Sequence, residues 1–327
     1  MINFDYSKPL SVPAAIAALS KDPAAKFIAG GTNLVDLMKR GVTNPQKLLD
    51  ITGLPLRAIE QKGNVISIGA LALNSDVANN ELVKKQLPLL SQALHAGASP
   101  QIRNMATVGG NLLQRTRCGY FYDTALPCNK RQPGSGCGAI GGHNRMHAIF
   151  GTSEKCIAVH PSDMCVALAA LNATIIVQGS KGSRRILFAD FHRLPGNNPE
   201  LDNTLLKGEL ITAVEIPVHP GLAGHSLYTK IRDRASYAFA LVSVAAAMEL
   251  NGKTIKTVRL AMGGVAHKPW RLRAAEDFLE GKEASFSNFQ QAATLVMKEA
   301  KSFGHNDFKL KLSPNTIVQT LQSVSGI

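Results

Sequence analysis

The chain has 327 residues, of which 45% are hydrophobic, so it can bury a large core and has room for about two or three domains. Its formal net charge is +13, but Lys and Arg are scattered and no basic tract is interleaved with aromatic residues, so we expect no nucleic-acid partner. The N-terminus does not resemble a signal peptide, and no apolar run reaches the ~18 residues of a membrane helix. We expect a soluble protein without membrane insertion, cytoplasmic or exported in a folded complex on a partner's signal.

The first part of the chain predicts alternating helices and strands. Ser11 can cap a helix that has Pro13 in its first turn. A strand at AKFIAGG then runs directly into a helix at TNLVDLMKR, which Thr32 or Asn33 can cap and Gly41 can end. A further strand, KLLDIT, completes a first predicted subdomain, residues 1–55.

The second part, residues 56–218, mixes strands, helices and one irregular insert. An alternating strand is predicted over 64–71, and a helical region over 75–98 should divide in two at Pro88. A glycine-turned element at 106–114 precedes the insert. The remaining predicted elements are a helix over 161–173, a hairpin over 174–188 and a strand before 218.

The third part, residues 219–327, predicts an antiparallel sheet. Three strands are expected, at 225–232, 237–250 and 254–266. A helix over 269–281 and further C-terminal helices would cover this sheet. Because strands and helices mix without regular βαβ units, the fold class is α+β.

All five cysteines fall within residues 118–165, and the first three lie in a segment without helical or strand periodicity. The intervals contain 9, 8, 18 and 8 residues, which match neither a zinc ribbon nor a ferredoxin-type run. Cys165 lies among apolar residues at helical spacing and predicts a buried free thiol. An insert of about forty residues, 114–156, needs something to organise it. Four thiolates on one [4Fe–4S] cluster would do so, and spacing alone leaves zinc or disulfides open; the predicted ligands are Cys118, Cys128, Cys137 and Cys156.

The composition of the insert suits an anionic cluster. The insert contains six basic and two acidic residues, so its net charge is six minus two, or +4. A [4Fe–4S] core on four thiolates is anionic, and nearby cations tune its potential. His143 and His147 have the spacing of a helical zinc pair, but they are bounded by glycines and lack the metalloprotease Glu, so we expect them at the insert surface.

Two Gly-Gly turns predict anion-binding loops. Gly30 and Gly31 end a strand where a helix begins, and Gly110 and Asn111 follow Thr107 in a second turn. The first turn could instead be a plain strand–helix connection, but the two turns together suit a long ligand with two phosphates. Asp163 could accept a hydrogen bond from a nucleotide hydroxyl or amine, or serve only as a helix cap.

Six motifs in order, AGGTNL, IRNMATVGGNL, PSDMCVALAALNA, GELITAVEIPV, YTKIRDRASYAFALVSVA and MGGVAHKPWR, make nearly the whole chain resemble a known family. It resembles the FAD-binding subunit of the molybdenum hydroxylases, the xanthine dehydrogenase family. The cysteine insert resembles the version with an extra [4Fe–4S] cluster, found in 4-hydroxybenzoyl-CoA reductase and, closer to this loop, in a bacterial aldehyde oxidoreductase. The xanthine-oxidising members lack that insert.

The resemblance implies a two-subdomain FAD-binding fold of the vanillyl-alcohol-oxidase type, followed by a C-terminal three-stranded antiparallel sheet with helices. It implies that one segment wraps the FAD pyrophosphate and a second glycine turn lines the site. One acidic residue would bind the nucleotide half, one apolar residue would touch the cofactor body, and one lysine would lie near the flavin. The pyrophosphate segment comprises Lys26, Phe27, Ile28, Ala29, Gly30, Gly31, Thr32, Asn33 and Leu34, and the second glycine turn comprises Thr107, Gly110 and Asn111. The acidic residue is Asp163, the apolar residue is Ile211 and the lysine is Lys230.

The resemblance also implies an electron-relay role within an oxidoreductase. A molybdopterin-binding large subunit would oxidise an aldehyde, and a [2Fe–2S] small subunit would pass the electrons to FAD on this chain and on to an external acceptor. The three chains would form a heterotrimer or a multimer of it. Two alternatives remain: a stand-alone FAD oxidoreductase with a structural cysteine loop, and a basic nucleic-acid-binding module with a zinc loop.

Overall fold

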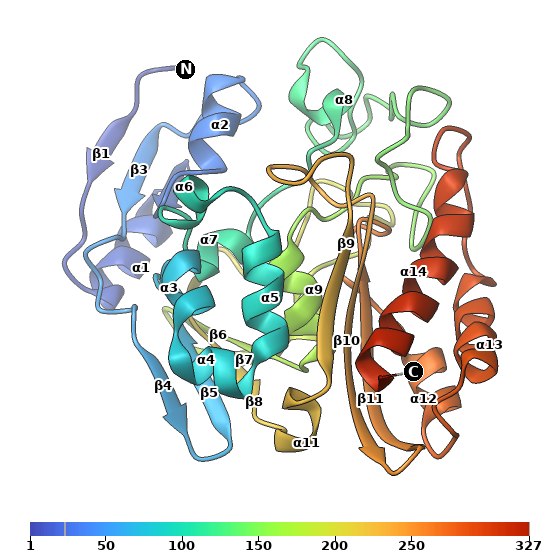
Figure 1. Cartoon of the computed structure of the whole chain (residues 1–327). Coiled ribbons are helices and arrows are strands. Elements are labelled where there is room, and N and C mark those ends of the chain that lie inside the picture. The colour runs from blue at the N-terminus through green and yellow to red at the C-terminus, as the bar shows by residue number, and fades with distance from the viewer. Residues whose placement is uncertain (23, 327) are drawn as a thin grey trace.

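The computed structural model describes residues 1–22 and 24–326 (Figure 1). The N-terminal part forms a small parallel sheet in the order β1-β3-β2, with two helices. Ser11 accepts a hydrogen bond from the backbone N–H of Ala14 and caps α1, as predicted, whereas Asn33 makes no side-chain cap on α2. The elements are β1 (Asp5–Ser7), α1 (Val12–Lys21), β2 (Ala25–Ile28), α2 (Leu34–Lys39) and β3 (Lys47–Asp50).

The second part is built on a five-stranded antiparallel sheet in the order β4-β5-β8-β6-β7. Its strands are β4 (Ile59–Lys62), β5 (Val65–Gly69), β6 (Thr174–Gly179), β7 (Gly182–Leu187) and β8 (Leu210–Pro217). The predicted hairpin is therefore present as β6 and β7. Buried residues of this sheet and of the helices beside it form the largest apolar core, which includes Ile68, Val177 and Val214.

The predicted division of the helical region in two was wrong, because it breaks twice. Asn80 ends one helix and caps the next, since its side chain accepts hydrogen bonds from the N–H groups of Leu82 and Val83. Pro88 then begins a third helix. The helices of this part are α3 (Asn74–Asn79), α4 (Glu81–Gln86), α5 (Pro88–Ala96), α6 (Pro100–Arg103), α7 (Val108–Leu112), α8 (Gly119–Tyr122), α9 (Asp163–Ala170) and α10 (Phe188–Phe191).

The third part contains the predicted strands and one more. The sheet order is β12-β11-β10-β9, and the short β12 adds a fourth strand to the three long ones. Most of β10 is buried, because α5 and α9 pack on the sheet from one side and α14 packs on it from the other (Figure 1). The elements are α11 (Pro220–Ala223), β9 (Ser226–Ile231), β10 (Val242–Asn251), β11 (Thr254–Gly263), β12 (Trp270–Arg271), α12 (Arg273–Leu279), α13 (Phe286–Met297) and α14 (Phe308–Ser325).

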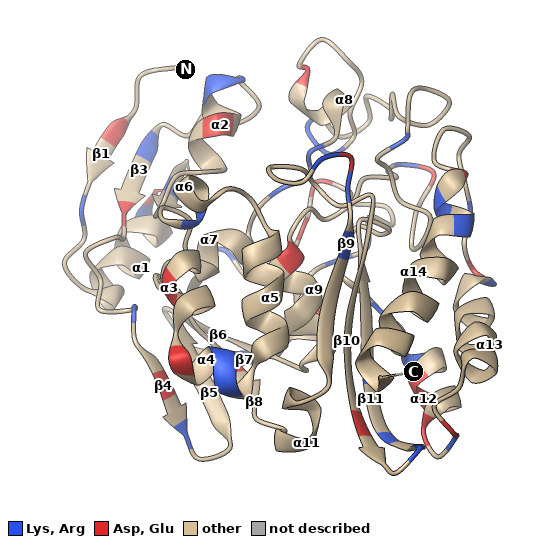
Figure 2. Cartoon of the chain, viewed as in Figure 1, with Lys and Arg blue, Asp and Glu red and all other residues tan. Residues whose placement is uncertain are grey.

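Charge is dispersed over the molecule. Figure 2 shows Lys and Arg spread among many elements rather than gathered along one helix or strand. Among the described residues, no helix is long and apolar enough to cross a membrane. The insert lies at the top of Figure 1, above β9 and β10, and its one short helix, α8, agrees with the irregular pattern of the sequence.

Candidate cofactor sites

The turn between β2 and α2 forms one wall of a cavity of about 440 Å³. Gly31 has a positive φ of 70°, which favours glycine. A Cβ on Gly30 would lie 1.8 Å from the carbonyl oxygen of Met105, so only glycine allows this turn to touch the backbone beside the second glycine turn. Residues 205–211 close the other side.

The second glycine turn is fixed by backbone hydrogen bonds. Thr107 caps α7, with its hydroxyl accepting from the N–H of Gly110 at 3.2 Å. Gly109 donates to the carbonyl of Ala70 at 2.8 Å, and a Cβ on Gly109 would meet that residue. The turn therefore lies against the end of β5 and contributes to the same cavity as the first turn.

A second cavity of about 690 Å³ adjoins the first. Thr32, Asn33 and Gly110 line both cavities, so the two glycine turns meet at their junction. Every residue predicted to bind FAD lines one or both of them. Lys26 to Leu34, Thr107, Gly110 and Ile211 line the first, and Thr32, Asn33, Gly110, Asn111, Asp163 and Lys230 line the second.

The groups at the junction suit an anion. The side-chain Nδ2 of Asn33 is buried without a hydrogen-bond partner, while its Oδ1 accepts from the backbone N–H of Arg115. Burial, and then the charge of Arg115, lowers the pKa of Lys26. An unpaired donor and two neighbouring cations in one cavity fit a pyrophosphate, which would accept a hydrogen bond and offset their repulsion.

Asp163 and Lys230 form a buried ion pair in the second cavity. The Lys230 ammonium lies 2.8 Å from a carboxylate oxygen of Asp163, and Tyr228 donates to the other oxygen at 2.7 Å. Asp163 is the first residue of α9, which Ser162 caps. The two residues that the resemblance assigns to the nucleotide half and to the flavin, Asp163 and Lys230, therefore lie side by side in this cavity.

All five cysteines are free thiols, and four are grouped in the insert. Cys128 and Cys137 face each other as isolated bridge partners. Burial, with further contributions from Cys128 and its neighbours, raises the pKa of Cys118 to about 12 and that of Cys156 to about 11. Cys165 is fully buried in α9, as predicted.

The four insert thiols lie near one another. Besides burial, the charges of Cys128 and Cys156 raise the pKa of Cys118, and those of Cys137 and Cys128 raise the pKa of Cys156. The four thiols could therefore act together as one set of sulfur ligands.

One cation, Lys130, and one histidine, His147, lie close to these thiols. Lys130 has a side chain that is 1% exposed and pairs with Asp202 at 2.5 Å, and its charge lowers the pKa of Cys156 against the effect of burial. His147 is buried, and its Nε2 lies 3.1 Å from the Sγ of Cys118. The prediction that His147 lies on the insert surface was therefore wrong, whereas His143 is exposed.

The matches to known proteins agree with the motifs. Residues 2–219 match the FAD-binding domain in molybdopterin dehydrogenase, and residues 226–324 match the C-terminal domain of the CO dehydrogenase flavoprotein. The chain belongs to this family of flavoproteins. The predicted resemblance is confirmed, and so is the expectation of an oxidoreductase subunit.

Two curated relatives and two solved structures illustrate the likeness. The aldehyde oxidoreductase FAD-binding subunit PaoB of Escherichia coli K12 is 48% identical, with 97% of each chain covered. The glyceraldehyde dehydrogenase medium chain of Sulfolobus acidocaldarius is 31% identical, covering 90% of this chain and 88% of its own. A carbon monoxide dehydrogenase structure from Hydrogenophaga pseudoflava matches with a TM-score of 0.78 at 25% identity, covering 100% and 99% of the two chains. Quinoline 2-oxidoreductase from Pseudomonas putida 86 matches with 0.76 at 26%, covering 99% and 98%. The α+β fold is therefore confirmed.

Sequence reasoning missed two residues in or near this flavoprotein's candidate sites, Arg115 and Lys309. Arg115 was counted only as an insert charge, although it lines the first cavity and pairs with Asp202 at 2.6 Å. Lys309, in α14, is fully buried and donates to the carbonyls of His147 and Gly264 at 2.9 and 2.7 Å. Burial, and then the charge of Arg145, lowers the pKa of Lys309 to about 7.

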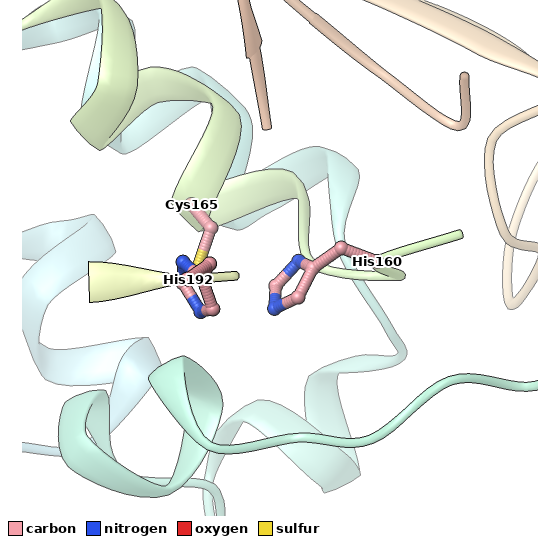
Figure 3. A group of neighbouring side chains, drawn as sticks. All are labelled: His160, Cys165 and His192. Atoms are coloured by element: carbon pink, nitrogen blue, oxygen red, sulfur yellow. The ribbon is translucent and has the colours of Figure 1, made fainter. Parts of the chain in front are cut away.

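One further group brings together metal-ligand side chains, namely His160, Cys165 and His192 (Figure 3). His192 donates from Nε2 to the carbonyl of Leu112, which leaves Nδ1 as an acceptor. His160 accepts at Nδ1 from the N–H of Ser162, which leaves its Nε2 as a donor. Both leftover nitrogens are buried without partners. A metal at this place would need a lone pair on His160 Nε2, where the ring carries its proton.

Proposed function

We propose that this chain is the FAD- and [4Fe–4S]-containing electron-transfer subunit of a molybdenum-dependent aldehyde oxidoreductase. The main support is that two adjoining cavities, lined by both glycine turns, lie beside an insert that groups four free thiols. The 48% identity to a subunit named as part of an aldehyde oxidoreductase supports the aldehyde as the substrate of the whole enzyme.

FAD would lie across the junction of the two cavities. Its pyrophosphate would accept from Asn33 Nδ2 and the glycine turns, near Lys26 and Arg115. The buried pair of Asp163 and Lys230 would contact one part of the cofactor together. When bound, FAD exchanges electrons singly or in pairs, which lets it connect iron–sulfur centres to a two-electron acceptor.

Cys118, Cys128, Cys137 and Cys156 would hold a [4Fe–4S] cluster. Burial raises the pKa of the Cys118 and Cys156 thiols, and binding to a metal group would compensate the cost of their buried thiolate charge. Lys130 would offset the negative charge of the cluster, as it does for Cys156.

The partners would be a molybdopterin-binding large subunit and a [2Fe–2S] small subunit, in a heterotrimer or its multimer. Electrons would enter from the [2Fe–2S] subunit and leave from FAD to an external acceptor. The assembly would act in the cytoplasm, or in the periplasm after export on a partner's signal. Within this chain, residues 1–55, 56–218 and 219–327 would form three structural units.

The test is flavin and iron analysis of the chain purified without air. We expect one FAD and about four irons, because one [4Fe–4S] cluster on four thiolates contains four. Cys137→Ser should lose most of the iron and keep FAD, whereas Cys165→Ser, the matched control outside the insert, should keep both. Protein that contains FAD but no iron would indicate that the cysteine loop is structural and holds no cluster. Folded wild-type protein without either cofactor would overturn the proposal.

A further inference from the structure

One insert thiol, that of Cys118, has a polar contact with a histidine that the proposed electron relay does not use. His147 Nε2 lies 3.1 Å from the Sγ of Cys118, within hydrogen-bond distance of a sulfur. His147 is 6% exposed, so water cannot readily take its place. Its other ring nitrogen, Nδ1, is buried without a partner.

The direction of this hydrogen bond follows from its geometry. A thiolate offers only lone pairs, so the ring nitrogen that lies 3.1 Å from Sγ, Nε2, must carry the proton. With the proton on Nε2, Nδ1 is a buried acceptor without a donor. This costs less free energy than a buried Nδ1–H without an acceptor.

The backbone fixes the ring in place from two sides. The N–H of His147 donates to the carbonyl of Asn144 at 2.9 Å. Its carbonyl accepts from Lys309 at 2.9 Å and from Asn306 at 3.4 Å, and both are buried residues near or within α14. The side chain of Tyr120 packs at a ring-centroid distance of 6.4 Å. This anchoring ties the ring to the C-terminal part of the chain and does not depend on the thiol.

We propose that His147 is a positioning residue for the cluster, whose Nε2–H donates a hydrogen bond to the Cys118 thiolate and raises the cluster's reduction potential. The inference rests on the proposed function, since it needs the cluster. A donor to a ligand sulfur stabilises the more negative, reduced cluster more than the oxidised one. The electron still comes from the partner subunits, and no proton is transferred.

The experiment is a potentiometric titration of the full-length chain, followed by the electron paramagnetic resonance signal of the reduced cluster. His147→Leu removes the donor and keeps an apolar side chain, and His147→Gln restores an N–H near Nε2. His143→Leu is the matched control, because His143 is an exposed histidine that lines the same 500 Å³ cavity as Cys118.

We expect His147→Leu to lower the midpoint potential by about 59 mV, a tenfold change for a one-electron couple. His147→Gln should recover most of this shift, and His143→Leu should have no effect. An unchanged midpoint in an iron-loaded His147→Leu protein, or equal shifts in the Leu and Gln variants, would overturn the inference. Absence of iron from wild-type protein that binds FAD would instead overturn the cluster part of the proposed function.

A second measurement covers the case in which the Leu variant does not hold iron. The wild-type protein is produced with ¹⁵N-labelled histidine and is then reduced. The weak magnetic coupling between the labelled nitrogen and the cluster is recorded. A weak coupling that disappears in His147→Gln supports the hydrogen bond. The absence of any coupling, or a strong coupling that indicates direct ligation of the cluster by histidine, would overturn the inference.

Discussion

At the scale of single residues, the cofactor site depends on a contact that only glycine permits. Gly30→Ala would place a Cβ 1.8 Å from the Met105 carbonyl oxygen and force the two glycine turns apart. We expect FAD affinity to fall at least about tenfold, or 1.4 kcal/mol, while the fold persists. Flavin-fluorescence titration of the apoprotein measures this.

The control for this substitution is Gly224→Ala. A Cβ there meets nothing within 4 Å, and Gly224 has a φ of −72°. It should bind FAD like the wild type. Equal affinity of Gly30→Ala and wild type would show that the turns need not touch for the cofactor to bind.

Local patterns predicted the residues that carry backbone geometry, and missed those defined by distant contacts. The glycine turns and the Ser11 cap follow from neighbours in sequence. The contact of His147 with Lys309 joins residues 162 positions apart, and that of Arg115 with Asp202 joins residues 87 apart. No periodicity or spacing reports such pairs, because only the tertiary fold brings them together.

At the scale of elements, the carboxylate of Asp202 pairs two cations of the insert with the loop before β8. Asp202 pairs with Lys130 at 2.5 Å and with Arg115 at 2.6 Å. Asp202→Asn would leave the buried Lys130 cation without its counter-charge. We expect a loss of about 3 kcal/mol in the free energy of unfolding and release of iron from the insert. Glu200→Gln, a partly exposed acid on the same loop, is the control and should change little.

The stabilisation that Asp202 provides should change with pH in a definite direction. Burial raises the pKa of Asp202, but Lys130 and then Arg115 outweigh it and lower the value to about 2, below the ordinary 3.8. The stabilisation is therefore complete above pH 4 and is lost as pH falls through 2. The difference in unfolding free energy between wild type and Asp202→Asn, measured in denaturant, should shrink over that window. A difference that stays constant would mean that Asp202 acts by packing rather than by charge.

Element types were more predictable than element boundaries. The apolar alternation of β5 and the hairpin of β6 and β7 identified strands correctly, since their periodicity is local. The break at Asn80 escaped because its cap resembles an ordinary polar residue within a helical pattern. β12 escaped because two residues carry no period.

At the scale of the whole molecule, the N-terminal unit is joined to the second one by a small core. Ala15 and Ile16 of α1 pack with Leu71 and Leu210 of the second unit. This core is far smaller than the other two large clusters. The first cavity is lined from both units, so a ligand in it would bridge them.

FAD should therefore act as a structural link as well as a redox group. Because it would bind only when both units are docked, FAD at a hundredfold excess over its dissociation constant should stabilise the folded chain by about 2.7 kcal/mol. Thermal unfolding of the chain with and without FAD tests this, and Gly30→Ala should show little gain at the same FAD concentration. If FAD binds but protects only residues 56–218 from proteolysis, and residues 1–55 are cleaved as fast as in the apoprotein, the cofactor does not bridge the two units.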